Sequence, residues 1–166
     1  MLGLNNVYIL LGSNIDPKLQ YIQDATKKIS LRVGEIENTS GIYKSKALGF
    51  KSKQLFFNQI LKITTSLTVE KVLDICLHIE KELGRIRQVG KKKIMSSRTI
   101  DIDIIYFNND VIDQDNLTVP HPRLHERKFT MLPLCEISPD YVHPIFEKTN
   151  EELLARCNDS SDVQMI

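Results

Sequence analysis

Residues 98–104, with the sequence Arg-Thr-Ile-Asp-Ile-Asp-Ile, place apolar and acidic side chains at alternating positions. Successive side chains of a β-strand point to opposite faces, so this pattern predicts a strand with Ile100, Ile102 and Ile104 facing a core. Asp101 and Asp103 would then share the other face. Two carboxylates this close repel each other, and burying either charge alone is costly. The segment therefore constrains the chain to a half-buried strand with an acidic face.

A divalent cation would relieve this repulsion, because hard cations such as Mg²⁺ prefer carboxylate oxygens as ligands. The aspartate pair thus favours metal-assisted chemistry, with phosphate as the natural substrate group. The alternative is an Asp-x-Asp on a solvated strand face without any function, since short motifs often match by accident. The two residues alone leave both interpretations open.

Composition limits the class of protein. The length of 166 residues suits one domain with a sizeable core, and 42% apolar with 26% charged residues is typical of globular proteins. A net charge of +1 means that any phosphate site must come from local clustering of charge. No secretory signal or membrane-spanning apolar run is visible, so we expect a cytoplasmic protein.

The cysteines argue against a disulfide framework and a structural zinc site. The chain has an odd number of cysteines, which lie far apart and form no Cys-x-x-Cys motif: Cys76, Cys135 and Cys157. Cys76 falls on the apolar stripe of a predicted helix, so we interpret it as a core residue.

The order of predicted elements indicates a fold. Helices are expected from Pro17, capped by Asp16, to about residue 31, and from Thr68 to Gly84. Strands are expected at residues 7–11, 36–43, 56–65 and 100–107. This is the βαββαβ order of an α+β, ferredoxin-like fold, whose mostly antiparallel sheet has helices packed on its faces.

The C-terminal third is expected to add smaller elements. Val111 and Ile112 are expected to pair back across the turn before them as a small hairpin. Helices are expected at residues 129–137, despite Pro133, and at residues 151–156. From about residue 158 the polar tail is expected to be loose.

Cationic residues flank the aspartate strand. Arg85 and Arg98 bracket a basic stretch, and arginine can bind phosphate oxygens in a bidentate manner. The alternative interpretation, a solvated charged loop, fits the lysines at 91–93 well. Cationic loops beside paired carboxylates favour a metal–nucleotide site, although no Walker A motif is present. His121, between two prolines, is a candidate contact for phosphate or ribose.

Several segments together resemble one known family. The motifs occur in family order, and they are Leu11-Gly12-Ser13-Asn14, Phe57-Asn58, Ile79-Glu80, Leu83-Gly84-Arg85, Arg98-Thr99-Ile100-Asp101-Ile102-Asp103, Leu117-Thr118-Val119-Pro120-His121-Pro122-Arg123-Leu124 and Arg127-Lys128-Phe129. The chain up to about Ser138 resembles the 6-hydroxymethyl-7,8-dihydropterin pyrophosphokinases of folate biosynthesis. The resemblance implies that residues 1–166 form a single pyrophosphokinase domain.

The resemblance implies a reaction and a role for each matching residue. The reaction is transfer of pyrophosphate from ATP to the hydroxymethyl group of the pterin, with AMP as the other product. Asp101 and Asp103 would hold two Mg²⁺ ions, and Arg85 and Arg98 would neutralise the transferred group. The implied pterin contacts are Ser45, Leu48, Phe56, Asn58 and Phe129, and the implied nucleotide contacts are Glu80, Arg87, Ile104, Thr118, His121 and Arg127.

One segment departs from the family pattern. Many members carry Arg-Trp-Gly-Pro just before the R-T-x-D-x-D motif, whereas this chain has Lys-Ile-Met-Ser-Ser at residues 93–97 and no tryptophan. The metal-binding aspartates and Arg98 are unaffected by this difference.

Two other functional classes compete with this interpretation. A metal-dependent phosphohydrolase could use the same carboxylates, but no third carboxylate or histidine ligand is evident nearby. An RNA-binding module could share the strand order, but Asp101 and Asp103 on the open face would repel phosphate. We expect neither nucleic acid nor membrane as a partner. We expect a monomer, because no long apolar stripe is left over for the surface.

Overall fold

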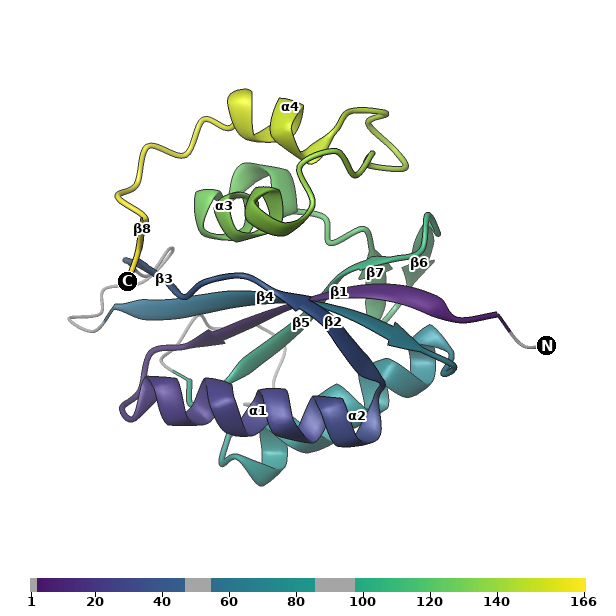
Figure 1. Cartoon of the computed structure of the whole chain (residues 1–166), viewed down its shortest axis with the longest axis vertical. Helices are drawn as coiled ribbons and strands as arrows, with labels where there is room; N and C mark the ends of the chain where they lie inside the picture. Colours follow the sequence, from purple (N-terminus) through teal and green to yellow (C-terminus); the bar gives the residue numbers. More distant parts are fainter. Residues whose placement is uncertain (1–2, 47–54, 86–97) are drawn as a thin grey trace.

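The computed structural model describes residues 3–46, 55–85 and 98–166. Within these residues, one antiparallel sheet runs through the middle of the molecule (Figure 1). Its order is β5 (Asp101–Phe107), β1 (Asn5–Ser13), β4 (Phe56–Thr65), β3 (Tyr43–Ser45) and β8 (Gln164–Met165). A further strand, β2 (Glu35–Thr39), also pairs with β4. The predicted α+β class is confirmed.

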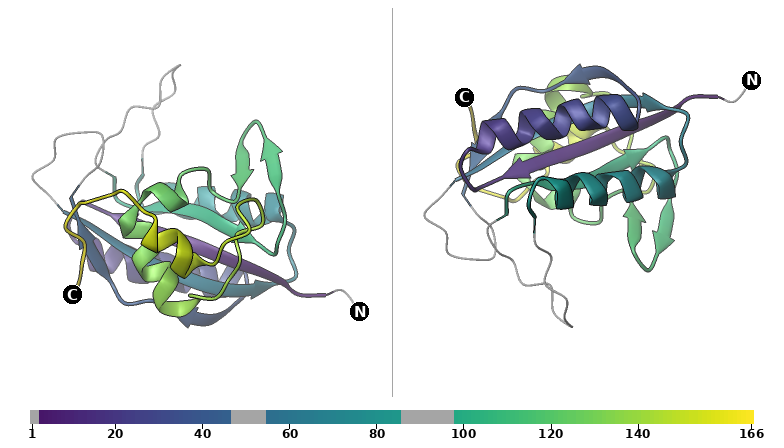
Figure 2. Two further views of the ribbon diagram at one scale, coloured as in Figure 1. Left: turned by 90° about the horizontal axis from the view of Figure 1, so that it is seen from above. Right: turned by 90° about the horizontal axis from the view of Figure 1, so that it is seen from below.

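Two helices cover one face of the sheet, here called the closed face. Figure 2 shows α1 (Lys18–Arg32) and α2 (Val69–Glu82) lying side by side across the strands. The opposite face, here called the open face, carries α3 (Lys128–Ile137) and α4 (Asn150–Ala155) (Figure 1). A short 3₁₀ helix at Leu124–Glu126 precedes α3.

The strands form a core on both faces because their side chains alternate. Val7, Ile9 and Leu11 of β1 pack with the helices of the closed face, whereas Tyr8 and Leu10 pack toward α3 and α4. β5 continues this division, since its isoleucines at 102 and 104 join the closed-face core. The predicted orientation of the aspartate strand is therefore confirmed.

The second helix is formed as the sequence predicts. Thr68 caps α2, its Oγ1 accepting a hydrogen bond from the Lys71 backbone N–H at 3.3 Å. Val72 and Cys76 are fully buried on its apolar stripe. Gly84 ends the helix with a φ of +89°, a conformation that side chains disfavour.

The start of the first helix differs from the prediction. Pro17 occupies the N-cap position and does not begin the helix. Asp16 does not cap either, because its carboxylate pairs with Lys18 Nζ at 3.0 Å. The predicted capping arrangement is wrong.

The single strand predicted at residues 36–43 is two strands. Both β2 and β3 pair with β4, and the chain between them leaves the regular ladder at Ser40. There the Ser40 hydroxyl accepts the Ile60 backbone N–H at 2.9 Å, taking the place of a main-chain carbonyl. One side-chain hydrogen bond thus divides the strand.

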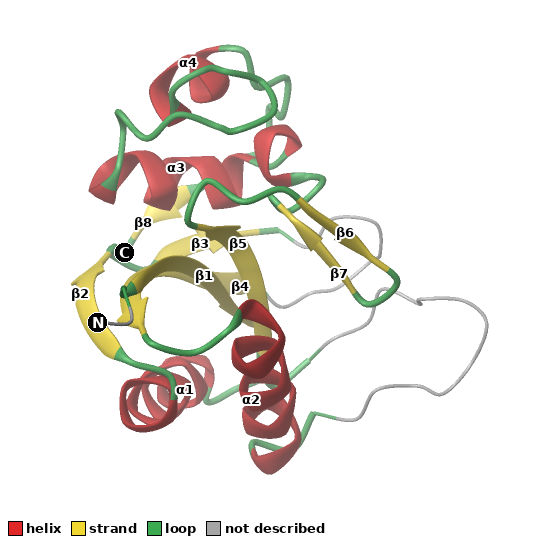
Figure 3. Ribbon diagram, turned by 90° about the vertical axis from the view of Figure 1, so that its right-hand side faces the viewer, coloured by secondary structure: helices red, strands yellow, loops and turns green. Residues whose placement is uncertain are grey.

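The C-terminal elements correct two further predictions. Figure 3 shows the hairpin of β6 (Ile112–Gln114) and β7 (Leu117–Val119), in which Ile112 lies opposite Val119 and does not pair back toward residue 107. The tail is not loose, because β8 pairs with β3 at the edge of the main sheet. The predicted helix at 129–137, with Pro133 inside it, is confirmed.

Candidate active site

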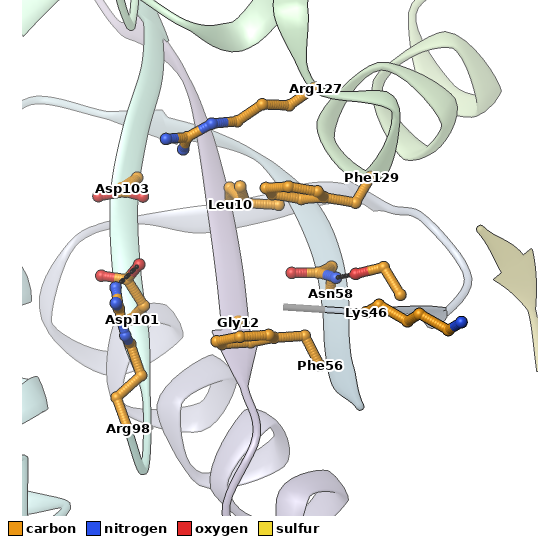
Figure 4. Close-up of a pocket in the computed structure, with 11 residues that line it drawn as sticks. Leu10, Gly12, Lys46, Phe56, Asn58, Arg98, Asp101, Asp103, Arg127 and Phe129 are labelled. Atoms are coloured by element: carbon orange, nitrogen blue, oxygen red, sulfur yellow. Dashed lines mark hydrogen bonds and ion pairs between the residues drawn. The ribbon is translucent and has the colours of Figure 1, made fainter. Parts of the chain in front are cut away.

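A cavity that opens to solvent lies on the open face of the sheet beside the start of α3, and its empty space, open solvent included, is about 520 Å³ (Figure 4). Strands β1, β3, β4 and β5 and the start of α3 contribute its walls. The lining residues are Leu10, Gly12, Ser45, Lys46, Phe56, Asn58, Arg98, Asp101, Asp103, Arg127 and Phe129.

The register of three strands builds the floor of the cavity. Gly12 of β1 lies between Asp101 of β5 and Asn58 of β4 as cross-strand neighbours. A Cβ atom at Gly12 would lie 3.1 Å from Asn58 Oδ1, closer than side chains normally approach. Glycine therefore keeps the floor open between the acidic residues and the amide.

Asp101 is held between two arginines. Its Oδ1 lies 2.6 Å from Arg85 Nη1, and its Oδ2 lies 2.9 Å from Arg98 Nη1. Burial favours the neutral acid, but the two guanidinium groups outweigh burial and lower the pKa of Asp101. Asp101 is therefore ionised. Its two ion pairs fix the position of its carboxylate and of the guanidinium groups of Arg85 and Arg98.

Asp103 is in a different environment two residues away. Burial, followed by the negative charges of Asp101 and Glu80, raises the pKa of its carboxyl. Within the described part of the chain, no hydrogen bond or ion pair engages this carboxylate (Figure 4). The site thus contains a destabilised negative charge that a cation would stabilise.

These carboxylates fit a magnesium ion that arrives with its substrate. The described residues contain no cluster of three or more histidine, cysteine or carboxylate side chains that could hold a metal alone. Mg²⁺ commonly binds through one or two carboxylates and completes its shell with water and phosphate oxygens. Two aspartates facing one cavity match that donor set.

Glu80 supports the aspartate strand from behind. Its buried side chain accepts the Ile102 backbone N–H at 2.9 Å and lies 3.0 Å from Arg85 Nη1. Ile102 separates the two aspartates, and β5 is the edge of the sheet, so this bond holds an otherwise exposed strand edge. No local pattern in the sequence indicates this link, because Glu80 and Ile102 lie 22 positions apart.

The other end of the cavity is aromatic. Figure 4 shows the rings of Phe129 and Phe56 on either side of the Asn58 side chain. Asn58 Nδ2 donates to Ser45 Oγ at 3.0 Å, which fixes the orientation of the amide. This arrangement suits a flat heterocycle between two rings, with polar atoms read by the amide.

Two arginines connect the aromatic and acidic ends. The Arg98 guanidinium lies 6.0 Å from the centre of the Phe56 ring, and the Arg127 guanidinium lies 5.7 Å from that of Phe129. Burial, and then the charge of Arg123, lowers the pKa of Arg127, and its buried Nε has no hydrogen-bond partner among the described residues. Such a desolvated cation suits a phosphate group.

Not every predicted contact lines the cavity. Ile104 lies in the closed-face core, and Thr118 is exposed on β7. His121 is half-buried, and its Nδ1 accepts the Arg123 backbone N–H at 3.2 Å. Leu48 and Arg87 lie outside the described residues.

Lys46 lines the cavity although no role was predicted for it. It belongs to a lysine-rich stretch, and composition alone does not distinguish one lysine there from its neighbours.

Among the described residues, no helix is long and apolar enough to span a bilayer.

Comparison with known proteins identifies the family. Residues 8–139 match the family model of 7,8-dihydro-6-hydroxymethylpterin-pyrophosphokinase, abbreviated HPPK. The chain belongs to the HPPK family. The predicted family membership is confirmed.

Similar HPPK proteins occur alone and within longer chains. The chain is 41% identical over 146 residues to the pyrophosphokinase of Aquifex aeolicus and covers 88% of it. It is also 41% identical over 139 residues to the folic acid synthesis protein fol1 of Pneumocystis carinii, but spans only 18% of that protein. The stand-alone relative is thus similar in length to this chain.

The fold also matches solved HPPK structures. A Plasmodium falciparum HPPK-DHPS structure aligns over 93% of this chain with a TM-score of 0.75 and 17% sequence identity, and the chain spans 42% of it. At this identity the match bears on the fold, which agrees with the ferredoxin-like α+β prediction.

Proposed function

We propose that this HPPK chain transfers the pyrophosphoryl group of ATP to 6-hydroxymethyl-7,8-dihydropterin in folate biosynthesis, giving the pterin diphosphate and AMP. The supporting observation is a single cavity with an aromatic and amide end and an acidic and cationic end. A pterin bound at the first end would present its hydroxymethyl group toward the second.

The pterin is bound by stacking and by hydrogen bonds. Phe56 and Phe129 sandwich the ring, while Asn58 and Ser45 recognise its polar edge, with Leu48 as a further contact. Stacking and a fixed amide orient the acceptor hydroxyl, and orientation is a large source of rate enhancement in group transfer.

The phosphate end is bound by charge. Asp101 and Asp103 would hold two Mg²⁺ ions together with ATP. When bound, the ions would neutralise charge on the phosphate oxygens. Arg98 and Arg85 stabilise the negative charge of the transferred group, and their contacts with Asp101 orient them before substrate arrives. The residues proposed for the nucleotide side are Glu80, Arg87, Ile104, Thr118, His121 and Arg127.

Product analysis with ATP, Mg²⁺ and the pterin tests this proposal. AMP that forms only when the pterin is present supports pyrophosphoryl transfer. ADP would indicate transfer of a single phosphoryl group. Phosphate released without the pterin would favour the competing phosphohydrolase.

We also propose that residues 1–166 act as a single-domain monomer. Light scattering on the purified chain should then give a mass near 19.1 kDa. A mass of twice this value at micromolar concentration would contradict the monomer.

A further inference from the structure

The C-terminal segment, residues 158–166, connects two walls of the cavity. It runs on the open side of the sheet from the end of α4 to the edge of β3 (Figures 1 and 2). The match to the HPPK family model ends at residue 139, so this segment lies outside the part of the chain that the family comparison covers. We call residues 158–166 the strap.

One end of the strap binds the start of α3. Asp159 Oδ2 accepts the Lys128 backbone N–H at 2.9 Å. Lys128 is the first residue of α3, and its neighbours Arg127 and Phe129 both line the cavity. The Arg127 side chain does not cap the helix, and Asp159 accepts, from a distance in sequence, one of the N–H groups that the first turn leaves without a partner inside the helix.

The Asp159 side chain is itself fixed by the strap. Its Oδ1 accepts the Ser161 backbone N–H at 2.9 Å, and Lys128 Nζ lies 3.4 Å from the Ser161 carbonyl oxygen. Burial acts against the charge, but hydrogen bonds from Ser161 and Lys128 outweigh burial and lower the pKa of Asp159. An ionised carboxylate at a helix N-terminus is also favoured by the helix dipole.

The other end of the strap binds β3. Gln164 and Met165 lie opposite Lys44 and Tyr43, and the Ile166 backbone N–H donates to the Ile42 carbonyl at 2.9 Å. The next residue of β3, Ser45, lines the cavity and accepts the Asn58 amide. The strap therefore joins the wall that carries Phe129 to the wall that holds Asn58.

We propose that Asp159 is a positioning residue for the pterin site, acting through the strap to fix Phe129 relative to Ser45 and Asn58. The inference rests on the proposed function, because it concerns how the pterin is held in the same cavity. Loss of the Asp159 contact frees the first turn of α3 and loosens one side of the aromatic slot. Stacking stabilises the bound pterin before and during transfer alike, so its loss affects KM more than kcat.

Three variants of the 166-residue chain test this inference. Asp159→Ala removes both acceptor oxygens, and Asp159→Asn keeps one. Asp162→Ala removes an exposed strap carboxylate that accepts hydrogen bonds from the Gln164 side chain. We expect the pterin KM to rise about fivefold or more in Asp159→Ala, the effect typical of losing one cap, and less in Asp159→Asn. In the Asp159 variants, the ATP KM and kcat should change less than about twofold. In the control, Asp162→Ala, the pterin KM, the ATP KM and kcat should all change less than about twofold.

Pterin fluorescence titrations in the presence of a non-hydrolysable ATP analogue separate the two proposals. If the wild-type chain binds no pterin, the proposed function fails and the inference with it. If the wild-type chain and Asp159→Ala bind pterin equally, the inference alone is overturned. An equal loss of kcat in both Asp159 variants, with unchanged pterin KM, would likewise overturn it. If Asp159→Ala does not fold, the Asn variant decides between these results.

Discussion

The two faces of the sheet are covered differently, and the difference separates stability from chemistry. On the closed face, α1 and α2 pack against β1, β4 and β5 with apolar side chains throughout. On the open face, α3 and α4 pack on a smaller core and leave the cavity beside it. Strand alternation lets one strand serve both purposes, because β5 sends Ile102 and Ile104 to the closed face and Asp101 and Asp103 to the cavity.

The separation is not complete, since two residues from the closed-face side reach the site. Glu80 of α2 and Arg85, just after it, pass around the β5 edge to contact Ile102 and Asp101. Substitutions can therefore test where the division holds.

The largest expected effect on activity is at Asp103. Asp103→Asn removes one proposed metal-binding charge, and we expect transfer to fall by about 10³-fold or more. Because no described ion pair engages Asp103, the same change should not lower thermal stability. Steady-state assays and a melting curve on the same sample measure both quantities.

Asp101→Asn is the matched comparison. It should lose activity to a similar extent, but it should also destabilise the protein by about 1–3 kcal/mol, because Arg85 and Arg98 lose their charged partner. Equal free energies of unfolding for Asp101→Asn and Asp103→Asn would contradict the claim that ion pairs stabilise Asp101 and not Asp103.

Arg98→Ala is expected to have the next largest effect. We expect kcat to fall by about 10²-fold with a smaller change in the ATP KM, because this arginine is proposed to stabilise charge that develops during transfer. Arg98→Lys should recover only part of the rate, since it keeps the charge but not the forked geometry. An unchanged kcat in Arg98→Ala would reject its catalytic role.

A closed-face substitution should show the opposite behaviour. Ile29 is fully buried on α1, and Ile29→Ala should cost about 2–5 kcal/mol in the free energy of unfolding. Activity per folded molecule should stay near that of the wild type. Leu31→Ala, on the same helix but 85% exposed, is the control and should change stability by less than about 0.5 kcal/mol. Urea titrations measure both.

The smallest expected effect is a pH dependence of the folding stability that comes from His143, which lies in the chain between α3 and α4. Burial, and then the charge of His125, lowers the pKa of His143 to about 4, and its unprotonated Nδ1 accepts the Ile145 and Phe146 backbone N–H groups at 3.1 Å. The unfolded chain binds this proton near pH 6.5, so the stabilisation is present above that pH and is lost as pH falls toward 4. Urea titrations between pH 7 and 4 should show it.

The control for this prediction is His143→Asn, whose amide oxygen can accept the same hydrogen bonds without titrating. As the pH falls, the wild type should lose stability relative to His143→Asn. A constant difference would contradict the assignment of this pH dependence to His143.

Local sequence patterns predicted the elements that depend on periodicity. The apolar stripe of α2, the full extent of β4 and the alternation of residues 100–104 follow from spacing alone, because each position repeats with the geometry of the element. After residue 104 a bulge in β5 breaks the alternation, and Ile105 and Tyr106 both join the open-face core. The same alternation places Asp101 and Asp103 together on the face opposite the isoleucines.

Long-range hydrogen bonds account for what the sequence did not predict. The break between β2 and β3 depends on Ser40 meeting Ile60, and the order of the tail depends on Asp159 meeting Lys128 and on β8 meeting β3. Such contacts join residues about 20 or more positions apart and leave no local pattern. The cap of α1 failed for a local reason, since Asp16 binds Lys18 in place of the helix.

Phosphorus NMR of one reaction mixture tests the central claim most directly, namely that the open-face cavity carries out pyrophosphoryl transfer. With ATP, Mg²⁺ and 6-hydroxymethyl-7,8-dihydropterin, the wild-type chain should give AMP and a pterin diphosphate in equal amounts, and Asp103→Asn should give neither. Equal product formation by Asp103→Asn, or ADP with a pterin monophosphate from the wild type, would contradict it.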